Sequence, residues 1–508
     1  MLDRRFYLIS LGCPKNLVDS AGIATLLRRA GYTAAATPEE ADLLIVNTCG
    51  FIAPAREESL AVLQELAQAR RPGQRIIAAG CYSQRFPHKL AEAVPGIDGF
   101  IGTRRWMDIV TLVEQLETSL PAAGRGRGRG RKPVYHLPET PTVGQDTQGV
   151  PRVAVQGASA YLKLADGCRR SCAFCAIPLI KGTAVSRPPE AILADARWLA
   201  ERGVREIILI AQDTTDYGHD QPLPHPLPHG ERGDPPGPPR EEGRGAETRF
   251  SGKNLVSRGR GGRSREGLAD LLTRLVTAVP GVPWMRLMYA YPGRVTEHLI
   301  ETMARHHQIL PYLDIPLQHA HPDVLRRMRR PADVEEVRRT IERLRAAMPD
   351  VAIRTTFLVG YPGETEAEFQ TLVDFMSEMA FDRVGVFTYS HEQGTPAART
   401  SARLRRAQSR CSAEPLEDDV PAEVKEERRE RLMEVQQSIS LAKNRALVGR
   451  TLDVLIEGQG DGLSVGRSYR DAPEIDGLVL VQTELPVGEI VPVRIASALE
   501  YDLVGEPA

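Results

Sequence analysis

The sequence predicts an α/β protein of three parts: an N-terminal parallel α/β domain, a central partial (βα)6 barrel and a small antiparallel β-barrel at the C-terminus. Short apolar runs of strand length alternate with helical stretches through most of the chain, which is the pattern of parallel sheets covered by helices. The last sixty residues instead hold short β-rich runs separated by Gly and Pro, as in small barrels. The 508 residues also exceed what one hydrophobic core normally holds.

The N-terminal domain is predicted from three apolar strands, FYLISL, LLIVNT and RIIAAG, with helical stretches at Ser20–Ala30 and Ala55–Ala69 between them. Six further strand-like runs and intervening helices predict the central barrel, and a charged helical segment at Val420–Arg445 precedes the small barrel. The predicted strands of the central part are YLKLA, REIILIA, WMRLMYA, YLDIPL, AIRTTFLVG and RVGVFTY, and its helices include Glu190–Arg202, Leu268–Val279 and Glu364–Met379. The predicted divisions are residues 1–120, 121–154, 155–400, 401–445 and 446–508.

Three segments break the alternation. Residues 121–154 contain the run GRGRGRGRK, which cannot bury a core and is predicted to be a linker, although its charge is compatible with an RNA contact. Residues 219–266 are rich in Pro, Gly and Arg and are predicted to be a disordered insert whose histidines do not bind metal. Residues 401–419 form a second insert, in which the lone Cys411 is predicted to be incidental.

The composition is that of a soluble globular protein, with 42% hydrophobic and 26% charged residues and a net charge of −1. No basic excess points to nucleic acid, no apolar run approaches the roughly 20 residues that span a membrane, and no signal peptide is evident. We therefore expect a cytoplasmic protein without a membrane partner. Seven cysteines, an odd number, argue against a disulfide framework and favour thiols that bind metal.

Cys168, Cys172 and Cys175 fall within eight residues, directly after the strand YLKLA. Iron–sulfur clusters use thiolate ligands, and three thiolates on a four-iron cubane leave one iron open to a substrate. A structural zinc site is the alternative, but it would need a fourth Cys or His, which this stretch lacks. The spacing therefore favours a cluster.

Cys13, Cys49 and Cys81 have no local motif, but each follows an apolar strand. In a parallel sheet these strand ends meet at one edge, which is where α/β folds bind ligands. We predict a second metal site there; three buried structural cysteines are the alternative.

Several polar residues are predicted at C-terminal strand ends of the barrel, where barrel active sites are built. They are Gln212, Asp213, Gln318, His319 and the segment VGYPGET at 359–365. Each of them could instead only shape a loop.

The CxxxCxxC motif after the first barrel strand resembles the radical S-adenosylmethionine (SAM) superfamily. The resemblance implies a [4Fe-4S] cluster on Cys168, Cys172 and Cys175, whose open iron binds SAM for reductive cleavage to a 5′-deoxyadenosyl radical. Phe174 resembles the aromatic position near the adenine, although a core position is an equal alternative. We expect Phe174, Gln212 and Gln318 to contact the cofactor.

The segments LGCPKN, NTCGF and GCYSQ resemble the N-terminal domain of methylthiotransferases. This implies a second [4Fe-4S] cluster on Cys13, Cys49 and Cys81 that carries sulfur, and a reaction that replaces C–H by C–S–CH₃ with a second SAM as methyl donor. Because an unactivated C–H bond has no acidic proton, such chemistry requires a radical from a cofactor. An electron donor such as flavodoxin or ferredoxin is also implied.

The stretches LGCPKNLVDS, CAIPLIKG, RSYRDAPEIDG and ALEYDLVGE resemble the RimO type of this family. That resemblance implies an aspartate of ribosomal protein S-twelve as substrate; a tRNA adenosine is the alternative. The terminal barrel resembles the TRAM domain, and residues 446–508 hold four arginines, no lysine and eleven acids, a net charge of −7. Because RNA-binding surfaces are basic, we expect that tRNA is not a partner and that Asp471, Glu474 and Asp476 attract a basic protein. A solvated acidic face is the alternative.

Overall fold

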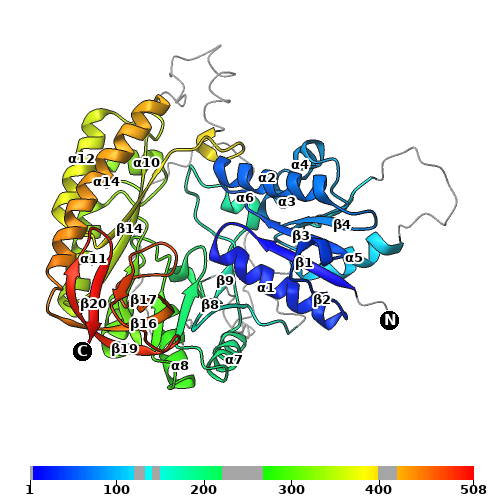
Figure 1. The fold of residues 1–508 in the computed structure, drawn as a ribbon. Coiled ribbons are helices and arrows are strands. Elements are labelled where there is room, and N and C mark those ends of the chain that lie inside the picture. The colour runs from blue at the N-terminus through cyan, green and yellow to red at the C-terminus, as the bar shows by residue number, and fades with distance from the viewer. Residues whose placement is uncertain (1–3, 119–131, 140–148, 220–266, 399–419) are drawn as a thin grey trace, which may run out of the picture.

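The computed structural model describes residues 4–118, 132–139, 149–219, 267–398 and 420–508. In Figure 1 the N-terminal part lies on one side of the molecule, and the central and C-terminal parts lie together on the other. The arginine–glycine run, nearly all of the insert at 219–266, and residues 401–419 with Cys411 fall outside the described residues. No helix among the described residues is long and apolar enough to cross a bilayer.

Within the described residues, the N-terminal domain is a six-stranded parallel sheet in the order β2-β1-β3-β4-β5-β6. Its strands are β1 Arg5–Ser10, β2 Thr33–Ala34, β3 Leu43–Thr48, β4 Arg75–Ala79, β5 Gly99–Gly102 and β6 Val134–His136. Its α-helices are α1 Pro14–Arg29, α2 Ala53–Ala69, α3 Gly80–Arg85, α4 Pro87–Ala93 and α5 Ile109–Thr118. Every residue of β3 is buried, as expected for a central parallel strand with both faces covered.

The central part is an open seven-stranded sheet within the described residues, in the order β15-β14-β13-β12-β11-β8-β7. Its strands are β7 Val153–Gln156, β8 Ser159–Lys163, β11 Glu206–Ile210, β12 Trp284–Leu287, β13 Ile309–Asp314, β14 Ala352–Val359 and β15 Arg383–Thr388, and a separate pair is formed by β9 Ala165–Asp166 and β10 Val185–Ser186. Its α-helices are α6 Ile177–Lys181, α7 Pro189–Ala200, α8 Leu268–Ala278, α9 Glu297–Arg305, α10 Pro322–Arg327, α11 Val334–Ala347, α12 Glu366–Met379 and α14 Ala422–Arg445. The strands β8 to β15 are parallel, which confirms the predicted partial (βα)6 barrel.

The predicted linker at 121–154 is wrong in part, because two strands fall within or begin in it. β6 extends the N-terminal sheet beside β5, where Tyr135 stacks on Phe100 at 4.9 Å between ring centroids. β7 pairs with β8 in antiparallel orientation and forms an edge of the central sheet. Both strands are too short to show an alternating pattern, so only their pairing partners define them.

The C-terminal part is a closed barrel in the order β16-β17-β18-β20-β19. Its strands are β16 Thr451–Gly460, β17 Leu463–Ser468, β18 Val479–Val481, β19 Ile490–Ala498 and β20 Leu503–Pro507. The prediction of a purely antiparallel barrel needs one correction, because β18 and β20 pair in parallel. The barrel covers the N-terminal ends of the central strands, where Arg467 forms a buried ion pair with Glu206, the first residue of β11.

Two of the three acids that were expected to attract a basic partner instead bind arginines and a tyrosine of the same chain. Asp471 is buried and pairs with Arg383, and the Asp476 carboxylate accepts a 2.7 Å hydrogen bond from the Tyr312 hydroxyl and lies 3.3 Å from Arg354. Only Glu474 is exposed. The expectation that these acids attract a basic partner is therefore wrong for Asp471 and Asp476. Both acids serve as counterions for arginines near the start of β14 and β15.

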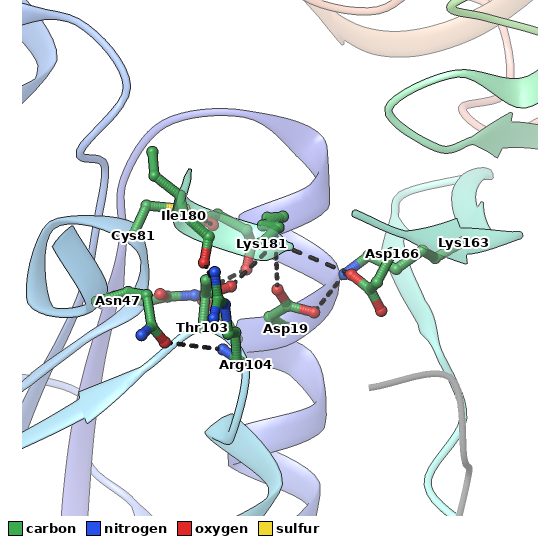
Figure 2. Close-up of polar contacts among 12 residues, drawn as sticks. Asp19, Asn47, Cys81, Thr103, Arg104, Lys163, Asp166, Ile180 and Lys181 are labelled. Atoms are coloured by element: carbon green, nitrogen blue, oxygen red, sulfur yellow. Dashed lines mark hydrogen bonds and ion pairs between the residues drawn. The ribbon is translucent and has the colours of Figure 1, made fainter. Parts of the chain in front are cut away.

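A buried charge network joins the N-terminal domain to the central sheet (Figure 2). Asp19, on α1, accepts hydrogen bonds from Lys163 of β8 and, at 3.2 Å, from Lys181 of α6. Asp166 of β9 accepts bonds from Lys163 at 2.9 Å and from Arg152 at 2.6 Å. All five side chains are almost fully excluded from solvent. Three cations share two carboxylates, so the loss of either acid would leave buried charge unpaired.

We expect Asp19→Asn to destabilise the packing of the N-terminal domain against the central sheet by about 3–5 kcal/mol, because removing one partner leaves buried cations uncompensated. The midpoint of thermal unfolding and the rate of limited proteolysis measure this. Glu378→Gln is the matched control, since its exposed pair with Arg338 should contribute at most about 1 kcal/mol. Equal effects of the two changes would contradict the role of the network.

Candidate functional site

The three N-terminal cysteines converge at one edge of the first sheet, as their positions after strands predict. Cys13 is the N-cap of α1, Cys49 follows β3, and Cys81 lies in α3 after β4. A Cβ atom on Gly12 would lie 2.8 Å from the Cβ of Cys49, and one on Gly50 would lie 2.7 Å from the backbone carbonyl carbon of Cys81. Glycine at these two positions permits the close approach of the three loops.

Asn16, one turn after Cys13, ties these loops together. Its amide nitrogen donates to the carbonyls of Leu11 and Thr48, each at 3.0 Å, and its Oδ1 lies 3.5 Å from the Cys81 sulfur. Its backbone carbonyl accepts a bond from the Asn47 side chain at 2.9 Å. The buried amide of Asn16 therefore joins the chain segments that precede Cys13 and Cys49 and contacts the Cys81 sulfur.

The barrel cysteines lie on the loop that follows β9. Gly167 begins this loop with φ +73°, and a Cβ there would lie 2.0 Å from the Thr183 carbonyl oxygen. Each of the three sulfurs accepts an N–H donor: Cys168 from the Arg170 backbone, Cys175 from the Ile177 backbone and Cys172 from the Arg330 guanidinium. Such donors stabilise negative charge on sulfur, which suits thiolates that bind iron.

A further group of potential metal ligands lies apart from the cysteines. In the described part of the chain, the only three ligand atoms that all lie within 4.8 Å of one another belong to His321, Asp323 and Glu368. The side chains of this group already have other partners, because Glu368 pairs with Arg327 and His321 caps α10.

The protonation of the thiols depends on burial and on two lysines. Burial raises the pKa of Cys168 to about 11 and that of Cys81 to about 12. Burial also acts to raise the pKa of Cys13, but the ammonium groups of Lys15 and Lys181, together with the backbone N–H groups of Asn16 and Lys15, lower that pKa below its usual value. Binding of metal by these thiols would therefore release protons.

One cavity of about 250 Å³ collects the residues predicted for the barrel site. Cys168, Cys172, Cys175, Phe174, Gln212 and Gln318 all line it. Two further lining residues, Lys15 and Phe51, come from the N-terminal domain, each two residues after a cysteine of the other triad. The cavity is thus built by both domains at the C-terminal ends of the central strands, as barrel folds require.

The structure adds residues that the sequence analysis did not assign. Tyr289 and Tyr291 line the cavity after β12, and Tyr289 has φ +63°, a conformation that is strained for a bulky residue. Arg170 also lines it and pairs with Asp213 at 2.7 Å, while Arg330 packs over the Tyr291 ring. The sequence signal that could have identified the two tyrosines is their position just after a predicted strand.

His319 and the segment 359–365 do not line this cavity. His319 is buried 3.6 Å from Glu364, and burial lowers its pKa to about 3. Gly360, with φ +68°, packs against Lys425 of α14. These strand ends contribute to the packing of α14. This agrees with the alternative that these residues only shape a loop.

A second, mainly apolar cavity of about 410 Å³ adjoins the first and shares Phe51, Phe174 and Gln318 with it. It runs between the start of α2 and the C-terminal ends of β14 and β15, where Phe387 and Tyr389 line it. The two cavities together provide space beside the barrel cysteines for more than one small molecule.

Comparison with known families divides the chain in the same three parts. Residues 5–102 match the Uncharacterized protein family UPF0004, residues 162–376 match the Radical SAM superfamily, and residues 448–507 match the TRAM domain. The radical SAM match implies a [4Fe-4S] cluster and SAM as cofactors.

Among solved structures, the radical S-adenosylmethionine methyltransferase TsrM from Kitasatospora setae, with cobalamin and a [4Fe-4S] cluster bound, aligns with a TM-score of 0.53. The alignment covers 81% of this chain and 80% of that chain at 15% identity, so it shows a shared fold alone.

Curated relatives match along nearly the whole length. The Chloroflexus aurantiacus protein named "Ribosomal protein uS12 methylthiotransferase RimO" is 47% identical over 514 residues, which cover 99% of each chain. Proteins of the same name from Roseiflexus sp. and Herpetosiphon aurantiacus are 45% and 42% identical, covering 99% of this chain and 97% and 99% of their own. Because this identity spans all three parts, the chain belongs to the RimO family of radical SAM methylthiotransferases and is an enzyme of that kind.

Proposed function

We propose that this enzyme converts a C–H bond of an aspartate in ribosomal protein uS12 to C–S–CH₃. The observation that carries the proposal is the shared cavity: residues adjacent to the N-terminal triad line the same space as the barrel triad. Full-length relatives that are named for uS12 methylthiolation support the choice of substrate.

In this proposal Cys168, Cys172 and Cys175 hold a [4Fe-4S] cluster and leave one iron without a protein ligand. With SAM bound, that cluster supplies the radical needed to open an unactivated C–H bond. Phe174, Gln212 and Gln318 hold SAM against it, which agrees with their place in the cavity wall. Arg330 supports the cluster through its contact with the Cys172 sulfur.

Cys13, Cys49 and Cys81 hold the second [4Fe-4S] cluster, which supplies sulfur. A second SAM donates the methyl group, and a reductant of the flavodoxin or ferredoxin class supplies electrons. Asn16 keeps these thiols at the cavity edge, and Lys15 and Lys181 favour the thiolate form of Cys13. Because the radical chemistry and the sulfur chemistry belong to different domains, the two domains must keep a fixed relative position. The buried charge network provides this.

The uS12 substrate is tested by incubating the reconstituted enzyme with SAM, a sulfide source and a reductant, together with either small ribosomal subunits or tRNA. We expect mass spectrometry to find one methylthio group on an aspartate of uS12 and none on tRNA. Modification of tRNA adenosine without modification of uS12 would overturn the assignment of substrate.

Changing Cys168, Cys172 and Cys175 to Ala should reduce the iron content from about eight to about four per chain and abolish SAM cleavage, because the ligands of the radical cluster are gone. Iron assay and detection of 5′-deoxyadenosine measure the two effects. Persistent SAM cleavage in this variant would show that the radical is generated elsewhere.

Changing Cys13, Cys49 and Cys81 to Ala should also remove about four irons but leave SAM cleavage in place, because the barrel thiols are untouched. Methylthiolation of uS12 should stop. If this variant still inserted sulfur at the normal rate, the N-terminal cysteines would be structural.

A further inference from the structure

Lys15 places a buried positive charge at the junction of the two domains. Its side chain projects from the first turn of α1 and lines the cavity that holds the barrel cysteines. The residue is only 6% exposed, and its ammonium lies 3.0 Å from the centroid of the Tyr289 ring. Among the described residues, no carboxylate lies within ion-pair distance of it.

The lack of an acid partner distinguishes Lys15 from the other buried lysines of this interface. Lys163 and Lys181 each contact both Asp19 and Asp166. Asp314, an acid whose charge acts on Lys15, already pairs with Arg354 at 3.1 Å. The other attractive charge interaction of Lys15 is with the Cys13 sulfur, which belongs to the N-terminal triad. A buried ammonium without a carboxylate partner is costly, and contact with an aromatic ring compensates only part of that cost.

Arg330, the other cavity cation without an acid partner among the described residues, has a different environment. Its guanidinium donates to the Pro316 carbonyl and contacts the Cys172 sulfur, so it belongs to the barrel triad. Lys15 comes from the opposite domain, and its ammonium lies over the ring of Tyr289, which also lines the cavity. The position of Lys15 thus suits an anion that enters the cavity from outside the chain.

We propose that Lys15 binds the side-chain carboxylate of the acceptor aspartate, which rests on the proposed function above. A charge-assisted hydrogen bond from the ammonium would fix the carboxylate and thereby orient the adjacent β-carbon between the two triads. Lys15 is then a substrate-binding residue that selects an aspartate over a neutral side chain of similar shape.

The test compares uS12 carrying the natural acceptor with uS12 in which that aspartate is replaced by Asn, using reconstituted enzyme. The wild-type enzyme should prefer the aspartate in kcat/KM. Lys15→Met, which keeps length but removes charge, should lower kcat/KM for the aspartate substrate about 10- to 100-fold and abolish the preference. Lys15→Arg should restore part of the preference, because it keeps a cation.

Lys89→Met is the matched control, since Lys89 is an exposed lysine of the same domain and should leave the preference unchanged. Iron content should stay at the wild-type value in Lys15→Met. An unchanged aspartate preference in Lys15→Met would overturn the inference, and loss of iron would assign Lys15 to the support of the N-terminal triad instead. Failure of the wild-type enzyme to modify uS12 at all would refute the proposed function itself, and the inference with it.

Discussion

The ion pairs of Asp19 with Lys163 and Lys181 are the interaction on which the arrangement of this enzyme depends. They lie where α1 of the N-terminal domain packs against β8 of the central sheet, and they are shielded from water. Buried ion pairs contribute little net stability but define geometry strongly, because a shifted partner leaves an unpaired charge. The network therefore fixes the relative position of the two domains. A purely apolar interface would define that position less sharply.

The two faces of α1 contact different domains. Lys15, Val18 and Asp19 face the central part, whereas Asn16 and Ser20 bind the loops of the N-terminal sheet. Helical periodicity produces this division directly, since residues three and four apart share a face. One helix thus begins at a cysteine of the N-terminal triad, supplies a cation to the shared cavity and attaches its domain to the barrel.

Features with a local sequence signal were predictable. The long apolar strands and both cysteine triads follow from periodicity and position, and the predicted cavity residues meet as expected. The short strands β6 and β7 lacked such a signal. The burial of Asp471 and Asp476 could not be predicted, because their arginine partners are about 90 to 120 residues away in sequence. For the same reason Lys15 and Tyr289 became visible as a pair only in the folded chain.

We propose that two iron sites, one from each domain, border one cavity. Anomalous scattering from iron in crystals of the anaerobically reconstituted enzyme tests it most directly. We expect two separate iron peaks with the shared cavity between them, one at Cys168, Cys172 and Cys175 and one at Cys13, Cys49 and Cys81. A single peak at the barrel cysteines, with the N-terminal thiols free of iron in fully reconstituted crystals, would contradict it.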